Sequence, residues 1–461
     1  MKIKLLVTIL LAAFVFYSCD DYNDLTPTVQ NETSGQANFS RYVAIGNSLT
    51  AGYQSSSLYQ SSQEFSYPKM IAKQMGVSSF EQPLISDPGI GGLYKIASLD
   101  PFITTREPVQ GGTPINLNYP APYNNLGIPG IVLADVMNST TSAGSFSKSP
   151  FIDIILRGQG TQFVQATALA PTFITLWIGN NDVLGYATSG GANPSAPTPN
   201  ATFTALFTQL ADGLAATGAN VAVANIPSVT AIPFFTTVGP PFGAQLKALS
   251  VPAFYYQSGT YSPTIGFPDQ LINKSMLLTL VSQTYLADFG KPTGKFYRDF
   301  GIPPAQVGVD TTQPFGASPL NPIPNALILD ANEIQTAANS TTAFNNAISV
   351  AVNNHPNQFA LVDMHSFFNN LAANGITASG IPFTTTFVTG GLFSLDGIHP
   401  TSQGYAIVAN EFIKVINSKF SASIPLVDVG SIPGSLQLAK RSFNKVILPD
   451  YDYNMLKNLC F

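Results

Sequence analysis

Charged side chains are scarce in this sequence. Asp, Glu, Lys and Arg make up 10% of its 461 residues, whereas an average soluble protein has roughly 25%. The formal net charge is −5, and no run of Lys or Arg occurs after the first few residues. A chain without a basic patch cannot neutralise a phosphate backbone, so these features exclude a nucleic-acid partner.

Cysteine, histidine and tryptophan are also rare. The two cysteines are Cys19 and Cys460, which excludes a disulfide-rich scaffold. The one tryptophan, Trp177, lies in an apolar run and is predicted to be a core residue. With three histidines, few metal sites are possible. Asp363 and His365 are close in sequence, but two ligands alone do not make a metal site.

The N-terminus has the pattern of an export signal. Two lysines precede an apolar run over residues 5–17, which is too short to span a bilayer comfortably and is closely followed by Cys19. This arrangement resembles a bacterial lipoprotein signal, in which the cysteine becomes the lipidated first residue of the mature chain. We therefore predict a signal peptide over residues 1–18, lipidation of Cys19 and a polar tether over residues 19–39. The alternative is an uncleaved signal anchor.

This signal implies an exported protein that is lipid-anchored to the outer membrane, on its periplasmic or cell-surface side. The acidic stretch directly after Cys19 resembles the export signals of some surface lipoproteins of Gram-negative bacteria. If Cys19 is acylated, Cys460 has no partner for an intramolecular disulfide. We expect a monomer that contacts the membrane through this anchor.

Buried strands alternate with amphipathic helices over much of the remaining chain. Apolar runs predict strands over residues 42–45, 171–179, 220–227 and 359–363. Apolar residues at helical spacing predict helices over residues 66–76, 203–214 and 330–354 and from residue 402 onwards. The order strand, helix, strand is typical of a parallel α/β unit. The sequence thus predicts a three-layer α/β/α fold with a mostly parallel central sheet.

Three segments interrupt this alternation. Residues 80–125 are predicted to be loop, because Pro and Gly occur throughout. Residues 230–325 combine many prolines with clusters of aromatic residues, and we predict a large irregular insertion there. Residues 421–461 have no assignable pattern and are treated as a C-terminal extension. The main domain is therefore expected to span residues 40–420.

Ser48 follows the first predicted strand. This strand ends at Gly46 and the chain turns at once, which places the next polar side chains at the carboxyl end of the sheet. Ligands bind at this edge in open α/β folds. A serine hydroxyl there is a weak nucleophile until a base accepts its proton. A catalytic role for Ser48 therefore requires a histidine nearby.

Three histidines are available as that base. His355 lies in a predicted helix-to-strand loop and is expected at the surface, and a structural role is favoured for His365 at a strand end. His399 lies three residues after Asp396 and directly before a helix. A turn can bring the Asp396 carboxylate to Nδ1 of His399 and leave Nε2 as the base. The alternative is an ordinary Asp-Gly turn with a histidine at a helix start.

An acyl-transfer site also needs donors for the developing oxyanion. Asn181 follows a buried strand and a glycine, so its side-chain amide can point over the same edge as Ser48. Gly130 can expose its backbone N–H where a side chain would block a substrate. Asp182 can bond to local backbone, and we assign it no chemical role.

Four short blocks resemble those of the GDSL/SGNH hydrolase family, in the family's order. They are GNSLTAG around Ser48, NLGIPG ending at Gly130, GNND around Asn181, and DGIH from Asp396 to His399. Each block alone occurs often by chance, but the four together are a strong signal. The resemblance covers roughly residues 40–420 and is poorest across the predicted insertion. It implies an SGNH-hydrolase-like, flavodoxin-like fold.

The resemblance also implies a role for each residue. Ser48 attacks an acyl carbonyl, His399 accepts its proton, and Asp396 orients His399. The backbone N–H groups of Ser48 and Gly130, together with the side-chain amide of Asn181, hold the oxyanion. No metal or cofactor is needed.

Two features depart from the family pattern. The family name gives Asp where this sequence has Asn47. Asparagine keeps an acceptor oxygen and adds a donor, so activity is expected to survive. The insertion is longer and more aromatic than a minimal member needs, and it could form a lid, form a wall for the substrate or close the site.

The leading hypothesis is a serine hydrolase that cleaves carboxylic esters, like an esterase or lipase, with an acyl lipid or an acetylated glycan as substrate. A carbohydrate O-acetylesterase is the alternative within the same chemistry. A catalytically silent surface-binding lipoprotein with the same fold is the alternative outside enzymology. The intact set of Ser48, His399 and Asp396 argues against this last hypothesis.

Overall fold

The computed structural model describes residues 33–99, 102–259 and 262–434. The predicted signal peptide over residues 1–18, the predicted lipidation site at Cys19 and the distal Cys460 lie outside the described residues. Within them, no helix is both long and apolar enough to cross a membrane.

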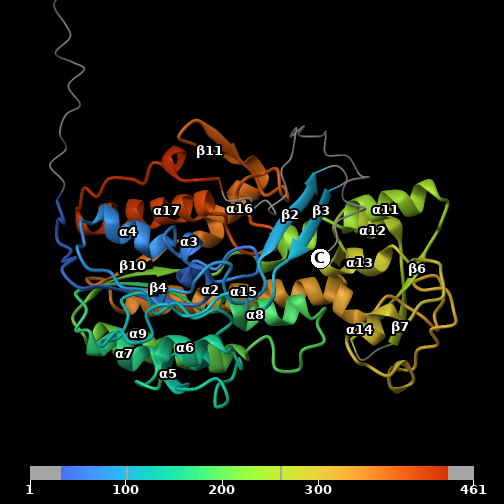
Figure 1. Cartoon of the computed structure of the whole chain (residues 1–461), viewed down its shortest axis with the longest axis horizontal. Coiled ribbons are helices and arrows are strands. Elements are labelled where there is room, and N and C mark those ends of the chain that lie inside the picture. Colours follow the sequence, from blue (N-terminus) through green and yellow to red (C-terminus); the bar gives the residue numbers. More distant parts are fainter. Residues whose placement is uncertain (1–32, 100–101, 260–261, 435–461) are drawn as a thin grey trace, which may run out of the picture.

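A parallel sheet of four strands lies at the centre of the fold (Figure 1). Its order is β1 (Tyr42–Gly46), β4 (Phe173–Trp177), β5 (Asn220–Ala224) and β10 (Phe359–Val362). Asn125 forms a parallel bridge with Ala44, so the next segment of the chain lies on the free side of β1. The segment that follows β1 is thus added on one side of this strand, and the later strands are added on the other side. The order of the strands reverses between β1 and β4, and open α/β sheets bind ligands at such a switch point.

Helices cover both faces of the sheet. One face is covered by α4 (Tyr67–Gln74), α16 (Met364–Asn374) and α17 (Ser402–Phe420). The other face is covered by α5 (Leu133–Asn138), α6 (Phe151–Leu156), α7 (Gln162–Ala168), α8 (Asn180–Thr188), α9 (Asn200–Ala215) and α15 (Ala331–Asn354). These layers confirm the predicted three-layer α/β/α fold.

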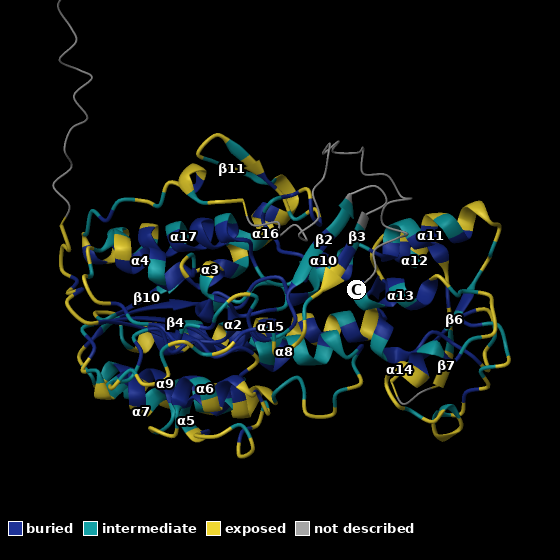
Figure 2. Ribbon diagram, viewed as in Figure 1, coloured by how far each residue is buried: buried dark blue, intermediate teal, exposed yellow. Residues whose placement is uncertain are grey.

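Successive residues of each strand point into different helical layers. In β1, Tyr42 and Ala44 pack with α4 and α17, whereas Val43 and Ile45 pack with the opposite layer. Both sets are fully buried, as the dark sheet in Figure 2 shows. Burial on both faces explains why the sheet strands are continuous apolar runs without alternation.

The predicted insertion forms a smaller lobe beside the sheet, with its own apolar core (Figure 1). Its helices are α10 (Pro233–Thr236), α11 (Gly239–Ala248), α12 (Pro268–Ile272), α13 (Gln283–Leu286) and α14 (Lys295–Asp299). Its strands are β6 (Phe254–Ser258), β7 (Ser262–Gly266) and β8 (Leu277–Leu278), and β8 pairs with β9 (Ile328–Leu329).

Residues 80–125 were predicted to be loop, and this prediction was partly wrong. They contain an antiparallel hairpin of β2 (Tyr94–Leu99) and β3 (Phe102–Arg106). Ile96 of β2 is buried in the core of the insertion lobe. The hairpin is therefore stabilised by packing against a distant segment, which the local density of Pro and Gly could not indicate.

Both ends of the described chain pack on the sheet domain. Residues 33–39 belong to the predicted tether, but the Gln36 N–H donates to the Phe420 carbonyl at 2.7 Å, and Phe39 is buried against Phe173. Residues 421–434 of the predicted extension run back along α17, where the Asn410 amide bonds both backbone groups of Val427. These two segments therefore form part of the domain.

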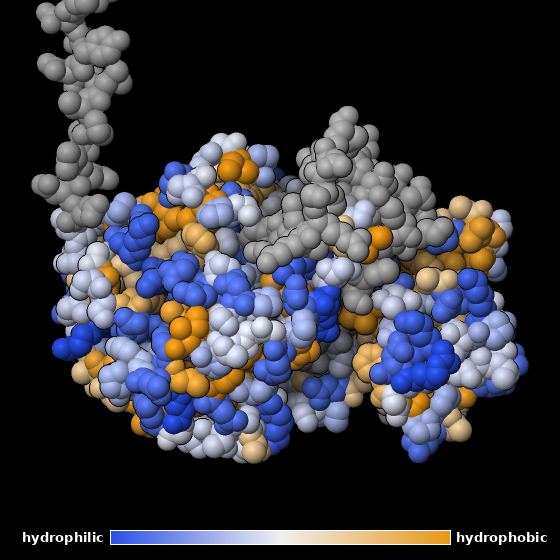
Figure 3. Space-filling view, in the orientation of Figure 1, coloured by the Kyte–Doolittle hydropathy of each residue, from blue (hydrophilic) through white to orange (hydrophobic). Residues whose placement is uncertain are grey.

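The remaining elements are short, and the surface is mixed. They are α2 (Ser48–Ala51), α3 (Gln60–Gln63), β11 (Ile376–Ala378) and β12 (Ile381–Phe383). On the face drawn in Figure 3, small apolar groups are interspersed with hydrophilic side chains. Such a surface is expected for a chain in which only 10% of residues are charged.

Candidate active site

Ser48 is the first residue of α2, directly beyond the end of β1. The turn between them is tight: a Cβ on Gly46 would lie 2.4 Å from the Trp177 carbonyl oxygen. The Asn47 side chain caps α2 by accepting from the Leu49 N–H at 3.1 Å. As the first residue of the helix, Ser48 has an N–H without an intrahelical acceptor. The turn thus presents both the hydroxyl and the N–H of Ser48 at the carboxyl edge of the sheet.

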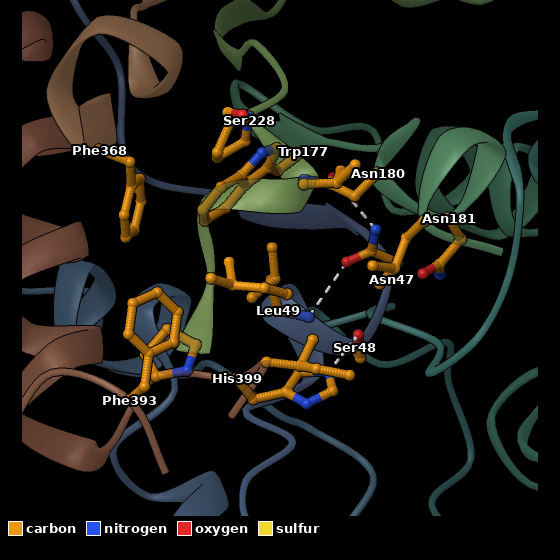
Figure 4. A pocket seen from close by; sticks show the side chains of 16 residues that line it. Asn47, Ser48, Leu49, Trp177, Asn180, Asn181, Ser228, Phe368, Phe393 and His399 are labelled. Atoms are coloured by element: carbon orange, nitrogen blue, oxygen red, sulfur yellow. Dashed lines mark hydrogen bonds between the residues drawn. The ribbon is translucent and has the colours of Figure 1, made fainter. Parts of the chain in front are cut away.

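The structure brings Ser48, His399 and Asp396 together, although Ser48 is far from the other two in sequence. His399 Nε2 lies 2.9 Å from Ser48 Oγ (Figure 4). On the other side of the ring, His399 Nδ1 lies 2.9 Å from Asp396 Oδ2. A carboxylate can only accept, so Nδ1 carries the proton and Nε2 accepts from the Ser48 hydroxyl. This is the geometry of a nucleophile, a base and an orienting acid.

The Asp396 carboxylate is held by several donors in addition to the imidazole. Oδ1 accepts from the backbone N–H groups of Ile398 and His399 at 2.9 and 2.8 Å, and from the Ser394 hydroxyl at 3.2 Å. Burial alone would raise the pKa of Asp396, but the charge of His399 and the hydrogen bonds of His399 and Ile398 bring that pKa below its usual value. The carboxylate therefore stays ionised and fixes the tautomer of His399.

The segment directly after α2 supports this carboxylate, and sequence reasoning missed it. The Ser56 N–H donates to Asp396 Oδ2 at 2.8 Å, and the Ser55 N–H donates to Ser394 Oγ at 2.9 Å. Both residues have left-handed backbone angles, with φ of 66° and 50°. Such angles are uncommon for serine and aim the two N–H groups at the acid loop. Two adjacent serines gave no sequence signal for this conformation.

Tyr53 contacts the base from the same segment. Its ring centroid lies 4.8 Å from that of His399, and its hydroxyl donates to the Ser56 carbonyl at 2.7 Å. The ring limits the rotation of the imidazole. Ser48, Tyr53 and Ser56 thus place the nucleophile, a wall of the base and a donor to the acid within one short stretch of chain.

The three predicted oxyanion donors come from three separate segments, namely the start of α2, the Gly130 loop and the first turn of α8. Asn181, in the first turn of α8, shares a pocket with Ser48 and His399. Its amide donates one hydrogen to the Ile131 carbonyl at 2.8 Å, which leaves the second hydrogen for a ligand. This bond also ties the α8 turn to the residue that follows Gly130.

Gly130 is exposed and has a φ of 84°, which favours glycine. The loop that carries it is held against the nucleophile turn, because the Ile128 N–H donates to the Gly46 carbonyl at 3.0 Å. A Cβ on Gly127 in the same loop would lie 2.3 Å from the Ala51 nitrogen. Close backbone packing therefore fixes the loop beside α2.

Asp182 is a positioning residue that sequence reasoning did not identify. Its Oδ2 accepts from the Leu133 N–H at 2.8 Å, at the start of α5, and its Oδ1 accepts from the Thr198 hydroxyl at 2.8 Å. Burial raises the pKa of Asp182 to about 7, against the lowering effect of these hydrogen bonds. Asp182 thus connects the Asn181 turn to the segment just beyond Gly130.

Asn47 uses both ends of its side-chain amide. In addition to capping Leu49 through its oxygen, it donates from Nδ2 to Asn180 Oδ1 at 3.2 Å (Figure 4). The extra donor anticipated for asparagine therefore has a partner. It links the turn after β1 to the turn after β4.

The other candidates lie outside this arrangement. His355 is not free at the surface: its side chain is 20% exposed, and Nε2 lies 2.8 Å from Asp212 Oδ1. His365 Nδ1 lies 3.0 Å from the Ile226 carbonyl oxygen, and Asp363 caps α16. Among the described residues, no three His, Cys, Asp or Glu side chains form a group that could hold a metal. Trp177 is fully buried, as predicted, and also lines the pocket.

Comparison with known proteins gives a family for the chain. A comparison with curated proteins found no match. The sequence model of the GDSL-like lipase/acylhydrolase family matches residues 42–262 and 294–412. The unmatched stretch between them lies within the predicted insertion, and all five residues of the candidate site lie within the matched ranges. Because these ranges make up most of the chain, the protein belongs to the GDSL-like lipase/acylhydrolase family.

Proposed function

We propose that this protein hydrolyses carboxylic esters through an acyl-enzyme on Ser48. Family membership implies hydrolase activity on esters. The observation that supports the mechanism best is the continuous chain of contacts from Ser48 Oγ to His399 Nε2 and from His399 Nδ1 to Asp396, each 2.9 Å long. A catalytically silent binding protein would have no need for these aligned contacts.

In the first half of the reaction, Ser48 Oγ forms a bond to the ester carbonyl carbon and gives its proton to His399 Nε2. The electron pair of the carbonyl moves onto its oxygen, which the N–H groups of Ser48 and Gly130 and the amide of Asn181 receive. Collapse of this intermediate breaks the bond to the alcohol, which leaves with the proton from His399. Asp396 stabilises the imidazolium throughout.

In the second half, water replaces the alcohol. His399 Nε2 takes a proton from the water as its oxygen attacks the acyl carbon, and the second intermediate collapses to release the carboxylic acid. The proton returns to Ser48 Oγ, so the enzyme is regenerated. Each turnover consumes one ester and one water and forms one carboxylic acid and one alcohol.

Labelling with a serine-reactive fluorophosphonate tests this proposal on the full-length chain. We expect label on Ser48, its loss in Ser48→Ala and strong reduction in His399→Gln. His355→Gln is a matched control, because His355 pairs with Asp212 and lies outside the site. Hydrolysis of p-nitrophenyl acetate should fall about 10³-fold or more in the two site variants. A folded wild-type chain that takes no label and cleaves no ester would overturn the proposal in favour of a silent binding protein.

The carbohydrate O-acetylesterase alternative uses the same chemistry. It is compatible with the pocket beside Ser48, whose volume of about 70 Å³ suits a small acyl group such as acetyl. Release of acetate from acetylated xylan, measured beside p-nitrophenyl acetate, distinguishes the two substrates. Faster turnover of the glycan would assign the enzyme to carbohydrate esters.

We also propose that Cys19 carries a lipid that anchors the exported protein to the outer membrane. The support is the sequence pattern of two lysines, a short apolar run and a cysteine. Growth of a Gram-negative host with an alkyne-tagged fatty acid should label the wild-type chain and Cys460→Ser but not Cys19→Ser. Equal labelling of Cys19→Ser would overturn this assignment.

A further inference from the structure

The pocket beside Ser48 has a polar end and an apolar end. Figure 4 shows Ser48, His399 and Asn181 at its polar end and Leu49 and Trp177 along its middle. Figure 4 shows Phe368 and Phe393 on the side away from Ser48 and Asn181, with Leu49 between. A substrate bound at Ser48 thus has a hydrocarbon surface extending to two aromatic rings.

The acyl part of the ester fits this apolar end better than the alcohol part. After the alcohol leaves, water must occupy its position next to His399 Nε2, so the leaving-group side has to stay open to solvent. An apolar pocket would exclude that water. The acyl group stays covalently attached to Ser48 through both halves of the reaction, and it can remain in a dry pocket throughout.

The length available to this acyl group is short. The pocket volume is about 70 Å³, whereas an engineered apolar cavity of about 150 Å³ admits benzene. At about half that volume, the pocket has room for roughly three carbons beyond the carbonyl. A longer chain that follows the apolar side of the pocket meets the rings of Phe368 and Phe393.

These walls are held in place by their surroundings. Phe393 is 4% exposed and lies in the loop that leads to Asp396, and its ring centroid is 6.3 Å from that of Phe368 on α16. Trp177 is fully buried, and its Nε1 donates to the Asn225 carbonyl at 3.1 Å. Phe368 is only half-buried, so it is the wall that can be shortened without opening the core.

We propose that Phe368 and Phe393 end an acyl pocket that limits this enzyme to short-chain acyl esters, from acetyl to about butyryl. The inference rests on the proposed function, because it assigns the acyl side of the ester that Ser48 attacks. The pocket selects the acyl group by its length, and the alcohol group stays outside it.

Two substrate series test this proposal on the full-length chain. In the first, p-nitrophenyl esters from acetate to octanoate vary the acyl group. In the second, acetate esters of alcohols of increasing length vary the leaving group. We expect kcat/KM to fall at least about tenfold between butyrate and octanoate and to change little with alcohol length.

Variants of α16 then test the wall itself. Phe368→Ala should reduce the preference for butyrate over octanoate about tenfold. Phe163→Ala is a matched control, because Phe163 is also a half-buried phenylalanine on a helix, α7, but does not line the pocket. If Phe368→Ala does not fold, Phe368→Leu should still shift the preference toward longer chains.

The outcomes separate this inference from the proposed function. Equal hydrolysis of butyrate and octanoate, or length dependence on the alcohol alone, would overturn the acyl-pocket assignment while Ser48 labelling stays intact. An unchanged preference in folded Phe368→Ala and Phe368→Leu would overturn the role of Phe368. Absence of both labelling and hydrolysis would overturn the proposed function.

Discussion

At the scale of single residues, Asn47 stands where the family motif has aspartate, and both ends of its side chain have partners in the site. Its oxygen caps the helix that starts at Ser48, and its nitrogen reaches Asn180 in the neighbouring turn. Aspartate would keep the cap but could not donate to Asn180 Oδ1. The Asn180 amide can compensate by rotating so that its own nitrogen faces the new carboxylate.

Asn47→Asp should therefore leave kcat/KM for p-nitrophenyl acetate within about tenfold of wild type, or roughly 1.4 kcal/mol in barrier. The double variant Asn47→Asp/Asn180→Asp places two carboxylates face to face and should lose much more than either single variant. Steady-state kinetics on the four proteins measure the coupling. A large loss in Asn47→Asp alone would show that the donated hydrogen bond to Asn180 is required.

At the same scale, Ser394 supports the base indirectly, through its contact with Asp396. Its hydroxyl donates to Asp396 and accepts from the buried Ser55 N–H. Ser394→Ala would leave that N–H without a partner, which costs about 1–3 kcal/mol in the free energy of unfolding. Turnover should fall less than in Asp396→Asn, because His399 and the backbone still hold the carboxylate. Denaturant unfolding and kcat of the two variants check this, and equal losses of kcat would contradict it.

At the scale of elements, the insertion is connected directly to the loop of the acid and base. The Phe234 N–H, in α10, donates to the Gly397 carbonyl at 3.0 Å. Val229 and Ile232, just before α10, line the pocket. Of the roles left open for the insertion, these contacts fit a wall for the substrate.

Gly397→Ala tests this connection. Gly397 has a φ of 68°, and a Cβ there would lie 2.9 Å from the Phe234 nitrogen. The variant should be strained and should push the Asp396–His399 turn away from α10, with a loss in kcat of about tenfold or more. Gly308→Ala is the matched control, because Gly308 has a φ of 70° and no atom within 4 Å of the added Cβ. Equal losses of activity in the two variants would show that contact with α10 does not position the turn.

At the scale of the whole molecule, buried carboxyl groups set how stability depends on pH. Burial raises the pKa values of Asp182 and Glu333 to about 7. Between about pH 4 and pH 7 the folded state keeps protons that the unfolded state has lost, so the free energy of unfolding falls as pH rises through this range. Asp396 acts in the opposite sense, since its lowered pKa gives stability that is lost as the pH falls below about 4.

The fold should therefore be most stable near the acidic end of the range from pH 4 to pH 7. Between pH 4 and pH 7, Asp182 should lower the free energy of unfolding by roughly 4 kcal/mol at most. Asp182→Asn keeps an acceptor for Leu133 and a partner for Thr198, and it should flatten this dependence. Denaturant unfolding of both proteins across the range measures the slopes. A wild-type stability that rises steadily from pH 4 to pH 7 would contradict the expectation.

The sequence predicted the parts of this molecule whose signals are local. Continuous apolar runs located the four strands of the sheet. Their alternation with helices predicted parallel strands, which places Ser48 and Asn181 at the same, carboxyl edge of the sheet. The left-handed turn at Ser55 and Ser56, the role of Asp182 and the β2–β3 hairpin escaped prediction. Each of these depends on a partner far away in the chain, namely Asp396, Leu133 and the insertion lobe.

The segment at residues 33–39 shows where an N-terminal tether would join the described part of the molecule. It meets Phe420 and Phe173 at the amino ends of the strands, whereas Ser48 lies at their carboxyl ends (Figure 1). A lipid on Cys19 would therefore hold the protein by the edge opposite its catalytic edge. An attachment at that edge would leave the catalytic edge free of the tether, so that esters in the surrounding medium could reach it.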